Sequence, residues 1–211
     1  MRRTLALFAA VAALIAAPDL DAQELPDGWA MRFDRPSAGA DMVDFRVMEP
    51  GWHVTTGRAG AAIFWQPGMT AEGDYRFSTA MHLFDPASHA EAFGLFVAGD
   101  DLESANQEYL YFLVRQTGEY LIKRRVGSET EDVVGWTAHA AIPEMAPGAE
   151  ESTEYDLAVE VDGAEARFLV NGAVVHTLST DAVDAGGQVG IRVNHMLDLH
   201  IEQLELTRSG M

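Results

Sequence analysis

The sequence has 211 residues, of which 14 are Lys or Arg and 33 are Asp or Glu, so the formal net charge at pH 7 is −19. A chain this acidic repels phosphate backbones and anionic lipid, which argues against nucleic acid and membrane surfaces as partners. The sequence contains no cysteine, which excludes disulfide bonds, thiolate metal sites and a cysteine nucleophile.

The first segment of the chain has the pattern of a secretory signal peptide. Arg2 and Arg3 precede the apolar run LALFAAVAALIAA, and small residues follow it. The run is shorter than the ~20 apolar residues that span a bilayer. We expect residues 1–22 to be removed on export to the periplasm or the exterior, with an earlier cut near Ala17 or a buried N-terminal helix as alternatives. Residues 23–211 are then expected to form a single domain.

Short runs with period-two alternation follow, separated by turn sequences. The expected strands are 75–84, 91–99, 109–115, 120–125 and three strands within 155–178. The last three are joined by Asp-Gly and Asn-Gly, which strongly favour tight hairpins. This spacing predicts an all-β sandwich or barrel of antiparallel strands. The residues expected between the two sheets of a sandwich are Phe112, Val114, Leu157, Val159, Phe168, Val170, Ile191 and Val193.

The order Tyr-x-Leu-x-Val-x-Val-x-Gly-x-x-x-x-Phe-x-Val-Asn-Gly-x-x-Val runs from Tyr155 to Val175, and Gly-x-Val-Gly-Ile-x-Val follows from Gly187 to Val193. This order resembles the concanavalin A-like jelly-roll superfamily, which includes laminin-G-like domains. With GWHVTTGRAGAAIFW and YLYFLVRQTGEYLIKRR, the sequence is most similar to bacterial secreted 3-keto-disaccharide hydrolase-like domains, over roughly residues 50–207. The Leu-Phe-Asn-Gly opening that is usual in that group is absent. The resemblance implies a two-sheet antiparallel jelly-roll.

Three functions follow from this resemblance, because the superfamily includes lectins, adhesion modules and hydrolases. The first is an exported domain that binds a carbohydrate or glycoconjugate on its concave sheet. The second is a glycoside-cleaving enzyme of the 3-keto-disaccharide hydrolase type, with histidine and carboxylate groups as acid and base. The third is a non-catalytic interaction module.

The C-terminal run GIRVNHMLDLHIEQLEL carries the candidate catalytic residues. As a strand, it places Asp198, His200 and Glu202 on one face at two-residue spacing. Family 16 glycoside hydrolases, which the resemblance includes, carry a Glu-x-Asp-x-Glu type strand at such a site. A retaining pair needs its carboxyl groups ~5 Å apart, whereas residues i and i+4 of a straight strand are ~13 Å apart. The alternatives are metal binding by Asp198 and His200, or the solvated outer face of a strand.

A second candidate site is a strip of aromatic and cationic residues. If the turn is centred on Thr117-Gly118, Arg115 pairs with Tyr120 and Tyr111 with Arg124, which places these four on one face together with Tyr109. Sugars stack on aromatic rings, and arginine donates to hydroxyls. The alternative is that the tyrosine rings pack beneath loops. The candidate ligand-binding residues on this exposed, concave surface are Tyr109, Tyr111, Arg115, Arg124, Arg192, Asn194 and His195.

His195 follows an interruption of the alternation at Asn194 that suggests a β-bulge, a feature common beside functional sites. The alternatives for His195 are a ligand or catalytic contact and a buried, hydrogen-bonded side chain. The sequence does not assign Trp52, His53, Trp65 and Trp136 to core or rim. Laminin-G-like domains sometimes bind calcium through loop carboxylates, so Asp100, Asp101 and Glu103 are candidate calcium ligands, although the spacing of a calcium-binding loop is absent.

Overall fold

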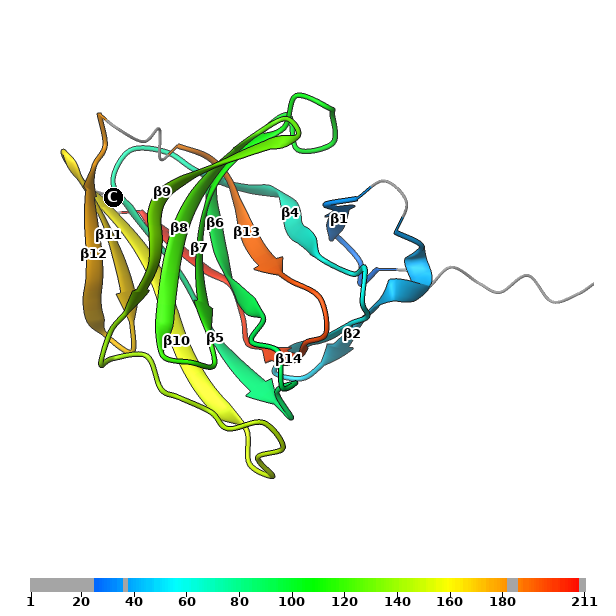
Figure 1. Ribbon diagram of the computed structural model, residues 1–211. Coiled ribbons are helices and arrows are strands. Elements are labelled where there is room, and N and C mark those ends of the chain that lie inside the picture. Colours follow the sequence, from blue (N-terminus) through cyan, green and yellow to red (C-terminus); the bar gives the residue numbers. More distant parts are fainter. Residues whose placement is uncertain (1–24, 36–37, 182–185, 209–211) are drawn as a thin grey trace, which may run out of the picture.

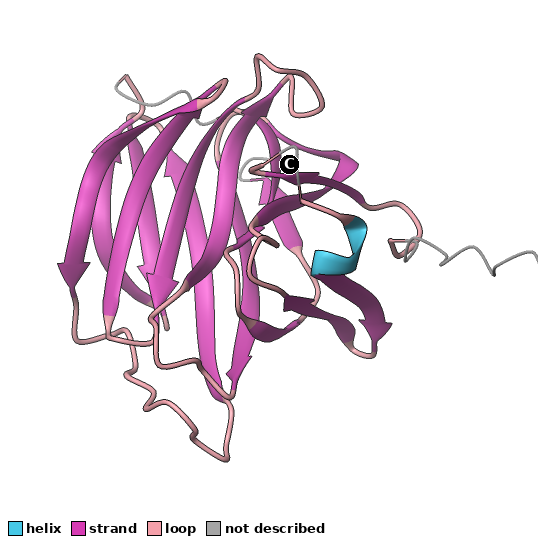
Figure 2. Ribbon diagram, turned by 45° about the vertical axis from the view of Figure 1, so that its right-hand side comes forward, coloured by secondary structure: helices cyan, strands magenta, loops and turns pink. Residues whose placement is uncertain are grey.

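The computed structural model describes residues 25–35, 38–181 and 186–208. These residues form two antiparallel sheets that pack face to face (Figure 1), which confirms the all-β sandwich prediction. The one helical element in these ranges is a 3-10 turn, η1 (Ala40–Met42), drawn in cyan in Figure 2. Within the same ranges, no helix is long and apolar enough to cross a membrane. The expected signal peptide, residues 1–22, lies outside the described residues.

The first sheet has seven strands in the order β1-β4-β13-β6-β7-β8-β9. Neighbouring strands in this order are antiparallel throughout. Its strands are β1 (Ala30–Phe33), β4 (Ala62–Ala71), β6 (Ala92–Asp100), β7 (Glu108–Arg115), β8 (Glu119–Val126), β9 (Glu129–Ala138) and β13 (Gly187–Val193).

The second sheet has the order β12-β11-β10-β5-β14-β3-β2, and β15 also pairs with β5. Its strands are β2 (Val43–Met48), β3 (Gly51–Thr56), β5 (Tyr75–Phe84), β10 (Thr153–Asp162), β11 (Glu165–Val170), β12 (Ala173–Ser179), β14 (Asp198–Ile201) and β15 (Glu205–Arg208).

The hairpins of β10, β11 and β12 form where the glycine dipeptides predict them. In the β11–β12 turn, Asn171 and Gly172 have φ values of 50° and 76°. Positive φ at both central positions gives a turn whose twist matches that of the flanking strands, and Asn-Gly tolerates it best. In the β10–β11 turn, Gly163 supplies a φ of 58°. These turns fix which side chains of the three strands face the opposite sheet.

The core between the sheets consists of alternate side chains from both sheets. All eight residues predicted there are buried in it. Phe93 of the seven-stranded sheet meets Tyr155 of the other edge to face at 5.2 Å between ring centroids, and Phe112 meets Phe168 at 5.3 Å. Buried aromatic pairs of this kind add to the free energy gained by removing the rings from water.

The C-terminal run is not a single strand, which corrects one expectation. β13 ends at Val193 in the seven-stranded sheet, and β14 begins at Asp198 in the eight-stranded sheet. The intervening turn contains Met196, whose φ is 61°. Thr56 anchors the turn, because its hydroxyl donates to the carbonyl of Asn194 and accepts from the amide of Leu197. The interruption at Asn194 is therefore a crossing between sheets and not a bulge within one.

Candidate functional site

The outer face of the seven-stranded sheet carries a second apolar layer. Strand β7 shows the alternation: Leu110 and Phe112 belong to the core between the sheets, whereas Tyr109, Tyr111 and Leu113 belong to a separate cluster on the outer face. This outer cluster consists of Ile63, Trp65, Ala92, Phe96, Leu102, Tyr109, Tyr111, Leu113 and Leu121. Sheet faces turned to solvent are usually polar, so a buried outer face is a distinctive feature.

The centre of this face is a stack of aromatic rings and an arginine. The rings of Tyr109 and Tyr111 lie 5.7 Å apart, and the guanidinium carbon of Arg192 lies 4.7 Å from the centroid of Tyr111. The Nη1 group of Arg192 donates to the Tyr109 hydroxyl at 3.1 Å. A desolvated cation over an aromatic face is attracted by the ring quadrupole. The stack holds Arg192 in one position.

Arg192 reaches the β7 tyrosines across β6 because the intervening position has no side chain. In the sheet register, Gly94 of β6 lies between Arg192 of β13 and Leu113 of β7. A Cβ on Gly94 would lie 2.2 Å from the carbonyl oxygen of Phe112. This close approach of two backbones requires glycine.

Asp34, just after β1, neutralises the buried arginine. Nη1 and Nη2 of Arg192 donate to the two carboxylate oxygens of Asp34, and Arg125 lies 3.3 Å from one of them. Burial alone would raise the pKa of Asp34, but the Arg192 hydrogen bond and the charges of Arg192, Arg125 and Arg35 outweigh it and hold that pKa below its ordinary value. Burial also raises the pKa values of Tyr109 and Tyr111. Asp34 and Arg192 therefore form a charged pair, and the hydroxyls of Tyr109 and Tyr111 beside it remain protonated.

The predicted aromatic strip is correct in part. Tyr109, Tyr111, Arg115 and Arg192 do lie on one face, but Tyr109 and Tyr111 are only 2% and 5% exposed, so the prediction that these two rings are exposed is wrong. The two rings pack within the outer cluster, which includes Leu102 from the loop after β6, and Arg32 of β1 donates to the Leu102 carbonyl.

The register of the β7–β8 hairpin also differs from the prediction, so Tyr120 and Arg124 do not lie on the predicted face. Arg115 pairs with Glu119 and Tyr111 with Lys123, one residue away from the predicted pairing. A one-residue slip moves every side chain of a strand to the other face. Tyr120 therefore lies in the core between the sheets. Arg124 pairs with Leu110 on that same side, where it forms an ion pair with Glu108 at 3.4 Å.

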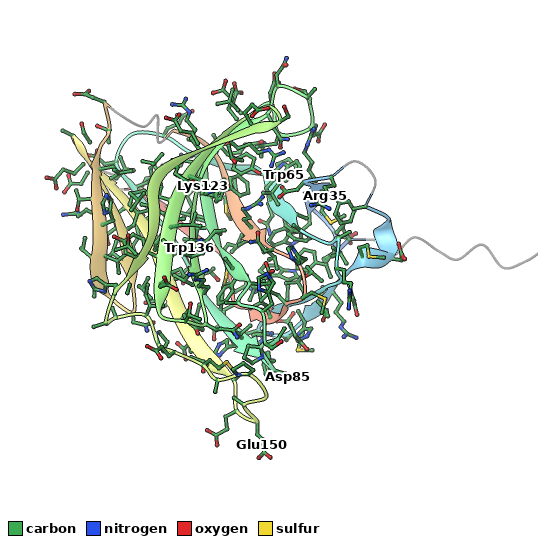
Figure 3. The ribbon with its side chains drawn as sticks, viewed as in Figure 1. Arg35, Trp65, Asp85, Lys123, Trp136 and Glu150 are labelled. Carbon is green, nitrogen blue, oxygen red and sulfur yellow. The ribbon has the colours of Figure 1, made fainter. Side chains whose placement is uncertain are left out.

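The exposed aromatic on this face is Trp136 of β9. Its side chain is 39% exposed, and the guanidinium carbon of Arg115 lies 4.0 Å from its ring centroid. Glu119 accepts from two nitrogens of Arg115, at 2.9 and 2.6 Å, and from the Thr117 hydroxyl at 2.7 Å. The Thr117 and Arg115 hydrogen bonds hold the pKa of Glu119 below its ordinary value. In Figure 3, Trp136 and Lys123 are labelled over the same part of the sheet.

A hollow opens beside this cluster. It has a volume of about 250 Å³ and is lined by Asp34, Arg35, Arg58, Ala59, Ala61, Arg192, Asn194 and His195. The hollow is rich in cations although the chain as a whole is strongly acidic. The Nε of Arg192 and the Oδ1 of Asn194 are buried, and no hydrogen-bond partner is present for either. The structure thus brings three of the predicted ligand-binding residues, Arg192, Asn194 and His195, to one hollow.

The candidate catalytic residues on β14 face the other way. Asp198, His200 and Glu202 lie on the outer face of the eight-stranded sheet, because Leu199 and Ile201 between them point into the core. His53, His200 and His82 align across β3, β14 and β5. Asp198 lies 2.7 Å from His53, and Glu202 lies 3.1 Å from His82. Glu202 shares a hydrogen bond with His82, which suits proton transfer, whereas the Oδ1 atom of Asp198 lies beside His53 without a hydrogen bond.

His200 lies between the other two histidines of this row. Burial lowers the pKa of His200, and the neighbouring His82 and His53 lower it further, while Glu202 acts in the opposite direction. The row shares no face with the tyrosine–arginine cluster. Asp198, His200 and Glu202 therefore lie on the opposite outer face of the sandwich from Tyr109, Tyr111 and Arg192.

The candidate calcium ligands Asp100, Asp101 and Glu103 lie at the end of β6 and in the loop that follows. In the ranges described, one group of three or more His, Asp or Glu side chains brings its ligand atoms within 4.8 Å of one another, and it consists of His89, Glu91 and His195. The loop is instead shaped by a turn in which the Ser104 amide donates to the Asp101 carbonyl at 2.8 Å, with Leu102 buried beneath it. Calcium binding remains a prediction.

Sequence reasoning missed several residues of these sites. Asp34 lies in a segment with no expected strand, and nothing local to it indicates its partner Arg192. The sequence pattern does not assign Trp136 to core or rim, and it does not predict the β9 strand that carries it. For His89 and Glu91, the two-residue spacing was a usable signal, because such a pair shares one side of an extended chain.

No protein-family model and no curated protein matches the sequence. Solved structures do resemble it. The carbohydrate-binding module CBM66 from Bacillus subtilis is 12% identical, with 85% of this chain and 94% of that chain covered and a TM-score of 0.59. A Bacillus subtilis protein of unknown function with a galectin-like fold is 12% identical, with 85% and 89% covered and a TM-score of 0.60.

The exoplasmic/lumenal domain of VIP36, in a form bound to Ca²⁺ and Man3GlcNAc, is 9% identical, with 87% of this chain and 85% of that chain covered and a TM-score of 0.57. At such identities the likeness shows the fold and not the activity. The chain has the galectin-like, concanavalin A-like jelly-roll sandwich fold.

Proposed function

We propose that this protein is an exported carbohydrate-binding domain, and that it binds a carbohydrate or glycoconjugate on the outer face of the seven-stranded sheet. The observation that carries this proposal is the exposed ring of Trp136, stacked on Arg115. A sugar ring packs its C–H face on such an indole, and neighbouring charged groups hydrogen-bond its hydroxyls. Arg115 and the Lys123–Asp132 ion pair, at 2.6 Å, supply those groups.

The rigid base beneath Trp136 supports binding. Arg115 contacts both the indole ring of Trp136 and the carboxylate of Glu119. These side chains are already ordered, so they lose little conformational freedom when a ligand binds. Solved structures of the same fold include a carbohydrate-binding module and a domain bound to Man3GlcNAc, which favours a sugar as the ligand. The signal-peptide pattern of residues 1–22 supports export.

A glycan array with the purified chain tests the proposal, followed by titration of each positive glycan against two variants. Trp136→Ala should weaken binding by about 5- to 10-fold, because a stacked aromatic contact contributes ~1 kcal/mol. Phe84→Ala is the matched control, since Phe84 is 36% exposed but lies on the other sheet. Binding that survives Trp136→Ala unchanged, or that Phe84→Ala abolishes, would contradict the proposed surface.

Glycoside cleavage, the activity implied by the resemblance to 3-keto-disaccharide hydrolase-like domains, is the second candidate. The hydrogen-bonded His82–Glu202 pair favours it, because a histidine joined to a carboxylate can move a proton, and Asp198 lies 2.7 Å from His53 in the same row. Release of reducing sugar from each bound glycan measures this activity. Release that is lost in both Asp198→Asn and Glu202→Gln, with binding retained, would identify the β14 face as catalytic. Absence of release from every bound glycan would favour a binding domain.

A further inference from the structure

Three side chains from separate parts of the chain converge at one end of the seven-stranded sheet. His89 and Glu91 precede β6, and His195 follows β13. The Nε2 atom of His195 lies 2.8 Å from Oε1 of Glu91, and the Nε2 atom of His89 lies 3.2 Å from the same oxygen. The candidate ligand atoms all lie within 4.8 Å of one another. Two imidazole nitrogens and a carboxylate oxygen thus lie close enough together for one ion to contact all three.

The sheet itself holds these groups together. β6 and β13 are neighbours, and the Asn194 amide donates to the Ala92 carbonyl at 3.0 Å just beyond the end of β13. This bond places His195 beside Glu91. The arrangement therefore follows from the strand register, with one exposed histidine, His89, at its rim.

The Glu91 carboxylate is buried, which favours the binding of a cation beside it. Its side chain is only 6% exposed, and a carboxylate so far removed from water needs a compensating cation. Its oxygen faces two imidazoles, each of which is uncharged unless protonated. A divalent ion bound by all three groups would supply the missing positive charge.

We propose that His89, Glu91 and His195 form a binding site for a divalent transition-metal ion, Zn²⁺ above all. Zinc is bound by imidazole nitrogen and carboxylate oxygen, and sites with three protein ligands leave a fourth position for water or another ligand. Calcium prefers six to eight oxygen ligands, which this group does not provide. The side chain of His89 is 83% exposed, so an ion can reach the site from solvent. His195 also lines the arginine-rich hollow, so the ion would lie at the rim of that hollow.

The site is independent of the proposed sugar binding, and metal titration of the full chain tests it directly. After treatment with a chelator, isothermal titration calorimetry with ZnCl₂ should give one tight site per chain, with CaCl₂ binding far more weakly. Cobalt substitution should give visible absorption bands of tetrahedral Co²⁺. His195→Ala and His89→Ala should each weaken zinc binding by at least about 10-fold, because even residues behind the ligands alter metal affinity by that much.

The control variant is His200→Ala, because His200 lies in the other histidine-rich region of the described structure, on the opposite sheet. This variant should bind zinc as the wild type does. His89 is highly exposed, so His89→Ala keeps the fold even if changes at the buried Glu91 do not, and a thermal melt checks this. Absence of stoichiometric zinc binding would overturn the proposal. Zinc binding that survives both His89→Ala and His195→Ala, or that His200→Ala abolishes, would also overturn it.

Discussion

Asp34 and Arg192, 158 residues apart in the sequence, are joined by two hydrogen bonds on the outer face of the seven-stranded sheet. The pair connects the end of β1 to β13, with β4 between them. Arg192 is the most deeply enclosed cation of this face, and the aromatic ring of Tyr111 lies beneath it. The carboxylate of Asp34 is therefore the group that makes a buried positive charge tolerable.

Asp34→Asn should be strongly destabilising. It removes the charge that compensates Arg192, and breaking a buried ion pair by removing one partner costs about 3–5 kcal/mol. Asp162→Asn is the control, since Asp162 is 70% exposed and forms a surface ion pair with Arg167, so its loss should cost less than about 1 kcal/mol. Urea denaturation measures both changes. Similar values for the two variants would contradict the role given to Asp34.

Tyr111→Ala should lower stability and should not act selectively on binding. Because Tyr111 is almost wholly enclosed, its removal leaves a cavity and takes the ring from beneath Arg192, at a cost of about 3–5 kcal/mol. Tyr111→Phe keeps the ring and should cost far less. Thermal unfolding of the two variants measures the difference. A Tyr111→Ala variant as stable as the wild type would show that the ring does not support the sheet.

Arg115→Ala should weaken glycan binding about as much as Trp136→Ala, because it removes the group that orients the indole and one hydrogen-bond donor. The expected loss is several-fold, or about 1 kcal/mol. Arg167→Ala, on the eight-stranded sheet, is the matched control and should bind as the wild type does. Glycan titration followed by tryptophan fluorescence measures both. Unchanged binding in Arg115→Ala would remove Arg115 from the site.

Stability should fall as the pH drops below about 6.5, in part through His200. Burial and the neighbouring His82 and His53 lower the pKa of His200 from its ordinary value of 6.5. A group with a lowered pKa in the folded state resists protonation there, so its contribution is full above the unfolded pKa and is lost as the pH falls through the folded one. The groups that face it are His53, His82 and Glu202.

His200→Asn should therefore lose less stability than the wild type between about pH 7.5 and pH 5.5, a window above the titration of ordinary carboxylates. Chemical denaturation at the two pH values gives the difference for each protein. Equal losses in the two proteins would show that His200 makes no contribution to the pH dependence.

The sequence predicts the sandwich well because local signals determine most of it. Alternation in β10 to β12 and the glycine turns between them fix which side chains enter the core, and Leu157, Phe168 and Val170 lie where they were expected. Such signals act over a few residues, so a single sequence is enough to identify them. The inward-facing residues of β13 follow the same rule.

The β7–β8 hairpin shows where local reasoning fails. A turn centred on Thr117-Gly118 would contain four residues, but the actual turn has three, with Gly118 at a φ of 79° and its amide donating to the Arg115 carbonyl at 3.1 Å. Both loop lengths are compatible with a glycine at this position. One residue of difference placed Lys123 and Arg125 beside the tyrosines in place of Arg124.

The candidate sites depended on contacts that no short segment encodes. The tyrosines are buried in a cluster that includes Leu102, from the loop after β6. Arg192 and His200 lie on opposite outer faces because the chain crosses between the sheets after Val193. Contacts between segments far apart in the sequence determine these features, and such contacts override the local sequence pattern.

The position of β13 also governs the order in which the molecule can be assembled. This late strand lies between β4 and β6, so a chain made from its N-terminus exposes the hydrogen-bonding edges of both until residues 187–193 are available. Unpaired edges can join other chains, and pairing across so long a stretch of sequence is slow. Synthesis that stops before Gly187 would therefore yield two halves of a sheet with no strand to connect them, prone to aggregation instead of folding as a smaller sandwich.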